Sequence, residues 1–211
     1  MVEGFKSKVH EIGRADEIDR ALSLDERTSK QIASIIIFSG NIEFHLERAI
    51  WRLDNQDPRG QRPRTDARPI IALIEMLEDH AQNCNSSKEQ DLITTWCAAA
   101  RGGFTIRNNI AHGVTSNIGD TLVLMRNPQW QGEIRKRGFG DIWCDEYTMD
   151  LIRQSFAVLL RTIVGMSSPE KQLPDVASPE IIRALREARS ILGEFASQDY
   201  NPSFDVARQS G

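Results

Sequence analysis

The sequence lacks the features that mark several specialised protein classes. Its 211 residues hold three cysteines and no Cys-x-x-Cys pair, which excludes a disulfide framework and a thiolate zinc site. The densest apolar stretch, Ile32–Phe38, is far shorter than the ~18–20 residues that cross a bilayer. Met1–Phe5 leads into charged residues and not into an apolar signal core. We therefore expect a cytoplasmic protein with no membrane partner.

Common enzyme motifs are also missing. The sequence has no GxGxxG, GxxxxGK[ST], GxSxG or HExxH pattern, which argues against nucleotide-loop enzymes, hydrolases with a nucleophile elbow and zincins. We expect no cofactor and no metal. The net charge of −4 gives no general attraction to nucleic acid. Any nucleic-acid site must be local.

The composition is that of a folded domain, with 40% hydrophobic and 27% charged residues. Apolar residues recur at a spacing near 3.6, which predicts an all-α helical bundle. We expect an N-terminal extension over residues 1–28, a bundle over 29–166, a linker and C-terminal helix over 167–197, and a flexible tail over 198–211.

Start signals locate the main helices. The apolar pattern predicts a first helix over Ser29–Asp54, followed by a loop over 55–64 and a second helix capped by Asp66. Ser86 and Glu89 have the spacing of a capping box, and Ser178 precedes a proline that can open the last helix.

The third helix, which starts after Ser86, carries two glycine signals. The pair Gly102–Gly103 interrupts its apolar stripe, which indicates either the close approach of another backbone or a kink. The stripe continues to Ala111, and Gly113 stands where a left-handed C-cap glycine is expected.

A small β-hairpin is predicted at about residues 120–143, inserted between helices. Thr121–Met125 is rich in strand-forming residues, Asn127-Pro128 is typical of a turn, and Gly138–Trp143 can return as the second strand.

One polar cluster interrupts the end of the third helix. Arg107 falls on the apolar stripe, where an arginine needs a partner for its charge. Glu43 interrupts the stripe of the first helix in the same way. The two side chains are predicted to meet across the helix interface. The alternative is that each reaches separately to the rim of the bundle.

The spacing of this cluster limits what one helix can do. Asn108 and His112 are four residues apart and share a face, whereas Arg107 and His112 differ by about 140° around the helix axis. A second copy of the helix would bring opposing groups together more easily, which suggests a composite site in a dimer. A histidine at a helix end can also be present because its charged form is favoured by the helix dipole.

The segment Arg107-Asn108-x-x-x-His112 resembles the R-polar-x(3–5)-H signature of the HEPN family, over roughly Ser29–Met166. The resemblance implies a HEPN-like helical bundle and metal-independent RNA cleavage by a homodimer whose paired motifs form one cleft. It implies that Arg107 binds the scissile phosphate, that His112 transfers protons as the ribose 2′-hydroxyl attacks, and that Asn108 orients either group. Some members carry a tyrosine two residues after the histidine, where this chain has Val114, so regulation by AMPylation there is unsupported.

A locally basic segment surrounds the motif. Between residues 101 and 137 six cations stand against Asp120 and Glu133, a local charge of +4. The candidate RNA-binding residues are Arg101, Arg126, Trp130, Arg135, Lys136 and Arg137. Trp130 could stack on a base. The alternative is a solvated hairpin edge whose charge discourages aggregation.

The sequence therefore predicts a HEPN-like endoribonuclease in toxin–antitoxin, abortive-infection or other defence, with RNA, a second copy and an antitoxin protein as candidate partners. A rival interpretation is a non-catalytic helical module that binds RNA or dimerises. In a third, Arg107 is purely structural and its loss leaves Glu43 buried and unpaired.

Overall fold

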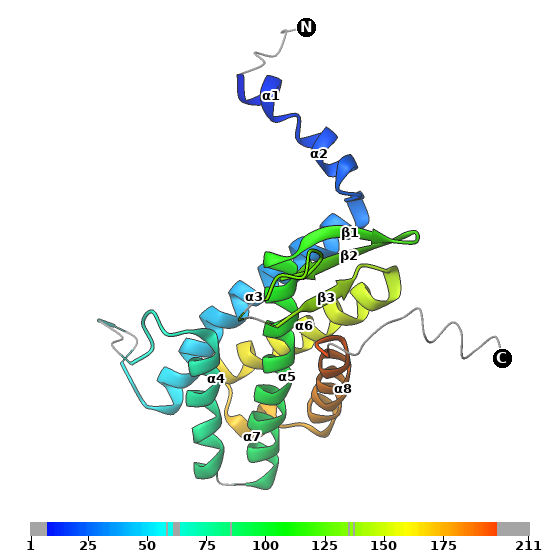
Figure 1. The fold of residues 1–211 in the computed structure, drawn as a ribbon. Helices are drawn as coiled ribbons and strands as arrows, with labels where there is room; N and C mark the ends of the chain where they lie inside the picture. The colour runs from blue at the N-terminus through cyan, green and yellow to red at the C-terminus, as the bar shows by residue number, and fades with distance from the viewer. Residues whose placement is uncertain are drawn as a thin grey trace, which may run out of the picture.

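The structure is a computed structural model that describes residues 8–57, 59–60, 64–84, 86–134, 136 and 138–197. It is mainly helical with one small antiparallel sheet (Figure 1). The helices are α1 Lys8–Gly13, α2 Ala15–Ala21, α3 Glu26–Leu53, α4 Ile70–Asp79, α5 Ser87–His112, α6 Glu146–Ser167, α7 Leu173–Val176 and α8 Pro179–Phe195, with a 3₁₀ turn η1 at His80–Asn83. The strands are β1 Val114–Ile118, β2 Thr121–Arg126 and β3 Gly140–Trp143.

Side-chain caps fix where the long helices begin. Asp25, Ser86, Asp145 and Ser178 each accept a hydrogen bond from the backbone N–H three residues on. The predicted starts at Ser86 and Ser178 are confirmed. The cap predicted at Asp66 is wrong, because α4 begins only after Pro69 and has no side-chain cap.

Helix α5 lies at the centre of the bundle. It packs along α8 and against α4 and α6, while α3 packs along α6 (Figure 1). Trp96 and Phe104 of α5 are buried in the core, and the Trp96 Nε1–H donates to the Leu159 carbonyl oxygen at 2.9 Å. Satisfying the indole in this way removes the cost of burying its N–H.

The glycine pair in α5 marks a close approach of another backbone. A Cβ at Gly102 would lie 3.1 Å from the Leu192 carbonyl oxygen of α8, and one at Gly103 would lie 3.3 Å from the Phe156 ring of α6. The helix runs unbroken through both glycines. Of the two predicted explanations, close approach is the one observed.

The predicted hairpin is the last two strands of a three-stranded sheet of order β1-β2-β3. The missing strand, β1, starts directly after α5 and pairs with β2 through a two-residue turn at Gly119-Asp120. Gly113 is not a left-handed cap, since its φ of −75° and ψ of 147° are those of extended chain. The helix therefore passes straight into the sheet.

The three thiols have the environments expected of structural cysteines. Cys97 and Cys144 are buried and Cys84 is partly exposed. Burial raises the pKa of Cys144 to about 12.

None of the helices within the described residues has the length and apolar character required to cross a membrane. The predicted tail over 198–211 lies outside the described residues.

We expect Gly102→Val to lower the free energy of unfolding by about 1–3 kcal/mol, because the new side chain overpacks against the α8 backbone. The matched control is Gly193→Ala on α8, where a Cβ meets nothing within 4 Å. That change should raise stability by about 0.5–1 kcal/mol through helix propensity alone. Urea denaturation measures both. Equal stabilisation by the two changes would show that the α5–α8 approach is wrong.

Candidate functional site

Glu43 and Arg107 form the predicted ion pair across the interface of α3 and α5. Arg107 Nη2 donates to Glu43 Oε1 at 2.6 Å. The Arg107 side chain is 27% exposed and that of Glu43 37% exposed. The pair thus stands at the edge of the core, where both groups keep contact with water. It is neither a fully buried charge pair nor two separate surface charges.

Asn108 adds a second acceptor for the same guanidinium. Its Oδ1 accepts from Arg107 Nη1 at 2.9 Å. The guanidinium carbon also lies 5.7 Å from the centre of the Phe104 ring, one turn earlier in α5. Arg107 is therefore held in one orientation by a carboxylate, an amide and an aromatic ring.

His112 stands apart from this arrangement. It is the last residue of α5 and is exposed, while Arg107 faces α3. The neighbouring Ala111, which the sequence placed on the apolar stripe, is exposed too, so the last buried apolar residue of α5 is Ile110, one residue earlier. The rotation of about 140° between positions 107 and 112 keeps the two side chains on different sides of the helix.

The sheet brings a further predicted residue to the end of α5. Val114, two residues after His112, pairs with Met125, so the backbone of Arg126 follows directly after this pair at the same end of the sheet. The segment after Arg126 carries Trp130, which is 64% exposed, and Lys136, which is also exposed. The predicted residues Arg135 and Arg137 lie outside the described residues.

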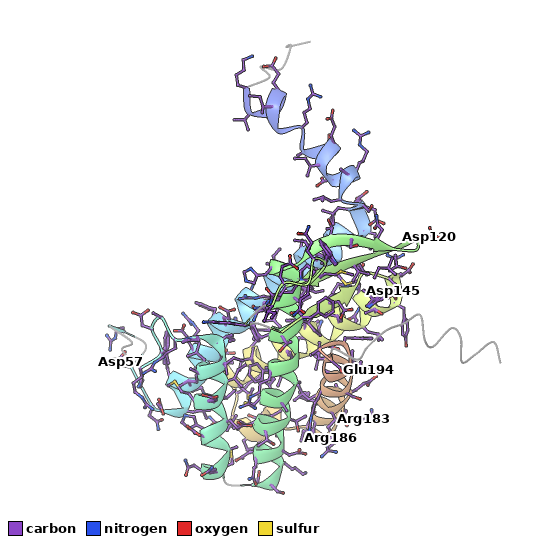
Figure 2. All side chains as sticks on the ribbon, viewed as in Figure 1. Asp57, Asp120, Asp145, Arg183, Arg186 and Glu194 are labelled. Carbon is purple, nitrogen blue, oxygen red and sulfur yellow. The ribbon has the colours of Figure 1, made fainter. Side chains whose placement is uncertain are left out.

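The acidic residue Asp120 lies at the other end of the sheet. It occupies the β1–β2 turn, at the tip that points away from the bundle (Figure 2). Since β2 runs from this turn to Arg126, the Asp120 carboxylate is separated from the α5 end by the length of the strand. It does not offset the positive charge of Arg126 locally.

Arg101 lies elsewhere. Its two terminal nitrogens bind both carboxylate oxygens of Glu78 on α4, at 3.1 and 2.5 Å. It is also about 16 Å back along the helix axis from His112. The structure thus does not bring Arg101 together with the other candidates.

Asn109 and β1 are the parts of this region that the sequence analysis missed. The Asn109 side chain is buried, and its amide lies against Gly140, where an added Cβ would come within 2.6–2.8 Å of the amide atoms. This contact seats β3 on the end of α5. A signal for β1 was present, because Gly119-Asp120 is a two-residue hairpin turn flanked by β-branched residues.

Comparison with known proteins gives no relative. No protein-family profile, no curated protein and no solved structure matches this chain. The chemistry of the site must be argued from its own geometry.

We expect a double-mutant cycle between Glu43→Ala and Arg107→Ala to give a coupling of about 1–2 kcal/mol. A pair that is about one-third exposed should fall between exposed pairs, at up to about 1 kcal/mol, and fully buried ones, at about 3–5 kcal/mol. The matched control is Arg186 on α8 (Figure 2), which binds Asp91 at the same 2.6 Å but is 65% exposed. A double-mutant cycle between Arg186→Ala and Asp91→Ala should give a smaller coupling than the cycle between Glu43→Ala and Arg107→Ala. The assigned role of the Glu43–Arg107 pair fails if both cycles give the same value.

The Glu78–Arg101 pair should shape the acid side of the stability profile. The hydrogen bond from Arg101 lowers the pKa of Glu78 below its ordinary value of 4.5. A lowered carboxyl pKa contributes stability that is complete above the ordinary value and is lost as pH falls through the lowered one. Arg101→Gln and Glu78→Gln should each make the loss of stability below pH 4.5 shallower. The effect should stay under about 1 kcal/mol because both groups are over one-third exposed. Denaturant titration from neutral to acid pH measures it, and wild-type slopes in both variants would contradict it.

Proposed function

We propose that this protein is a HEPN-like endoribonuclease that cleaves RNA without a metal ion, as a homodimer, in toxin–antitoxin, abortive-infection or other defence. The observation that carries the proposal is the Arg107 guanidinium, held at the edge of the core by Glu43 and Asn108 on the helix that ends in the exposed His112. An arginine oriented this firmly, with 27% of its side chain exposed, can present its remaining N–H groups to a phosphate.

The reaction would be an attack of a ribose 2′-oxygen on the adjacent phosphorus. The bond from phosphorus to the 5′-oxygen breaks, which leaves a 2′,3′-cyclic phosphate and a 5′-hydroxyl. His112 would accept the proton of the 2′-hydroxyl, and a protonated imidazole would return a proton to the 5′-oxygen. Arg107 would stabilise the charge that develops on the phosphate oxygens.

A dimer would bring together the arginine and the histidine, which lie apart in a single chain. Arg107 and His112 face different sides of α5, so one helix does not present both to the same phosphate. Two helix ends facing one groove would pair Arg107 of one copy with His112 of the other. The neighbouring Arg126, with Trp130 and Lys136 on the segment that follows it, would contact the backbone and bases of single-stranded RNA.

One observation favours a second candidate, a non-catalytic module that binds RNA or dimerises. The Arg107 charge is already compensated by Glu43 within a single chain. A residue with that role can be structural. An antitoxin protein remains a candidate partner of the first function only.

RNA cleavage in EDTA tests the proposal. Wild-type protein should cut single-stranded RNA and leave cyclic phosphate ends. Arg107→Ala and His112→Ala should each lower the rate at least about 100-fold, the smallest effect typical of a positioned acid–base group. The matched control is Arg186→Ala, which removes a cross-helix ion pair of similar length on α8 and should keep the wild-type rate.

Glu43→Gln separates positioning from folding in the same assay. Glutamine keeps an acceptor of similar size for Arg107 but removes the charge. Activity should fall while the circular dichroism and the melting temperature stay near those of the wild type. Cleavage that persists in both Arg107→Ala and His112→Ala rejects the assigned site. RNA binding without any cleavage by the wild type favours the non-catalytic module.

A further inference from the structure

The two N-terminal helices stand away from the bundle. Neither α1 nor α2 contains a buried residue, and they project beyond the sheet as an arm (Figure 1). They have six and seven residues. Isolated helices shorter than about 12–15 residues are marginal in water, so helices of this length depend on packing against something else.

The arm also exposes apolar side chains in a helical pattern. Val9 and Ile12 are spaced by three residues and are 77% and 81% exposed, and Ile18 and Leu22 are spaced by four and are 53% and 38% exposed. Each pair lies on one side of the chain that carries it, and Leu22 directly follows α2. The left-handed Arg14, with φ of 40° and ψ of 51°, separates α1 from α2. The arm therefore exposes two separate apolar pairs with nothing of its own bundle against them.

A matching surface lies on the outer side of α3. Ile36, Ile37 and Phe44 are 37%, 61% and 54% exposed, and the exposed Gly40 lies between them. We call this surface the α3 stripe. A Cβ at Gly40 would meet nothing within 4 Å, so another helix can approach closely at this point.

The base of the arm directs it away from the α3 stripe of its own chain. Ser23, between α2 and α3, has a left-handed φ of 57°, and its Oγ accepts from Asn117 Nδ2 at 2.9 Å. Leu24 packs against the core and Asp25 caps α3. These contacts fix the exit of the arm beside the sheet (Figure 1).

We propose that the arm, residues 8–22, docks on the α3 stripe of a second copy of this chain, so that two copies exchange arms. Helices α1 and α2 are about 9 and 10 Å long, and the stretch of α3 from Lys30 to Arg48, which spans about 27 Å, is long enough to receive both. The exposed cation Lys30 lies at one end of the stripe and Arg48 at the other, where its guanidinium lies 4.4 Å from the centre of the Phe44 ring. Helix α2 carries the carboxylates Asp16, Glu17 and Asp19 against the single cation Arg20, so its charge is opposite to that of both ends of the stripe.

A two-fold arrangement doubles the contact. Each copy contributes four large apolar residues from its arm and three from its stripe. The inference concerns association alone and does not depend on RNA cleavage.

Molar mass in solution tests the exchange with one substitution on each surface. In the full chain, Ile12→Asp and Ile37→Asp should each weaken the dimer at least about tenfold, by placing a carboxylate in an apolar contact. The matched control is Ile134→Asp, which makes the same change at a residue that is 100% exposed on the segment after β2. It should leave the dimer intact. Circular dichroism should show the wild-type fold in all three.

Disulfide trapping identifies which surfaces meet. A mixture of Ile12→Cys protein with Ile37→Cys protein should form a covalent heterodimer on oxidation, whereas neither protein alone should dimerise covalently. A monomeric wild type, or a dimer that resists both aspartate substitutions, overturns the exchange. So does a covalent dimer of Ile37→Cys alone, which would indicate α3 against α3. An internal disulfide in the monomeric double variant would indicate that the arm folds back on its own chain.

Discussion

Burial of α5 is the constraint on which the rest of the structure depends. A helix of 26 residues that is apolar on several faces must be covered on several sides, and α4, α6 and α8 supply that cover. The approach of α8 is possible because Gly102 leaves room for the Leu192 backbone. Toward its end α5 is covered less completely, since Arg107 and Asn108 are partly exposed and Ala111 and His112 are exposed.

The ion pair made by Arg107 also follows from the burial of α5. An arginine near the end of a buried helix needs a counter-charge, and Glu43 answers from α3 at the point where the two helices meet. The pair is about one-third exposed, which lowers its desolvation cost and leaves the guanidinium within reach of an anion. The hydrogen bond from Arg107 to Asn108 further restricts the orientation of the guanidinium. Under the proposed function, the stability of the bundle and the binding of phosphate would use the same group.

Some features of the fold and the site could be predicted from the sequence alone, because the signal for each of them lies in a short stretch of chain. A charge that interrupts an apolar stripe is visible in sequence, so the pairing of Glu43 with Arg107 was predictable, as were the caps at Ser86 and Ser178. The partner of Arg101 was not, because contact with Glu78 depends on how α4 lies against α5. The strand β1 was missed because its side chains are mostly exposed and give no clear alternation of buried positions.

The sheet explains how a helix end can become a site. Because α5 passes directly into β1, the pairing of β1 with β2 returns Arg126 to the side of His112. The buried Asn109 amide against Gly140 ties β3 to the same helix turn. The backbone pairing of β1 with β2 thus fixes the end of β2 at the C-terminal end of α5. Arg107 remains on the other side of the helix, facing α3. In the proposed dimer, a phosphate bound between two copies of this surface would meet all three groups.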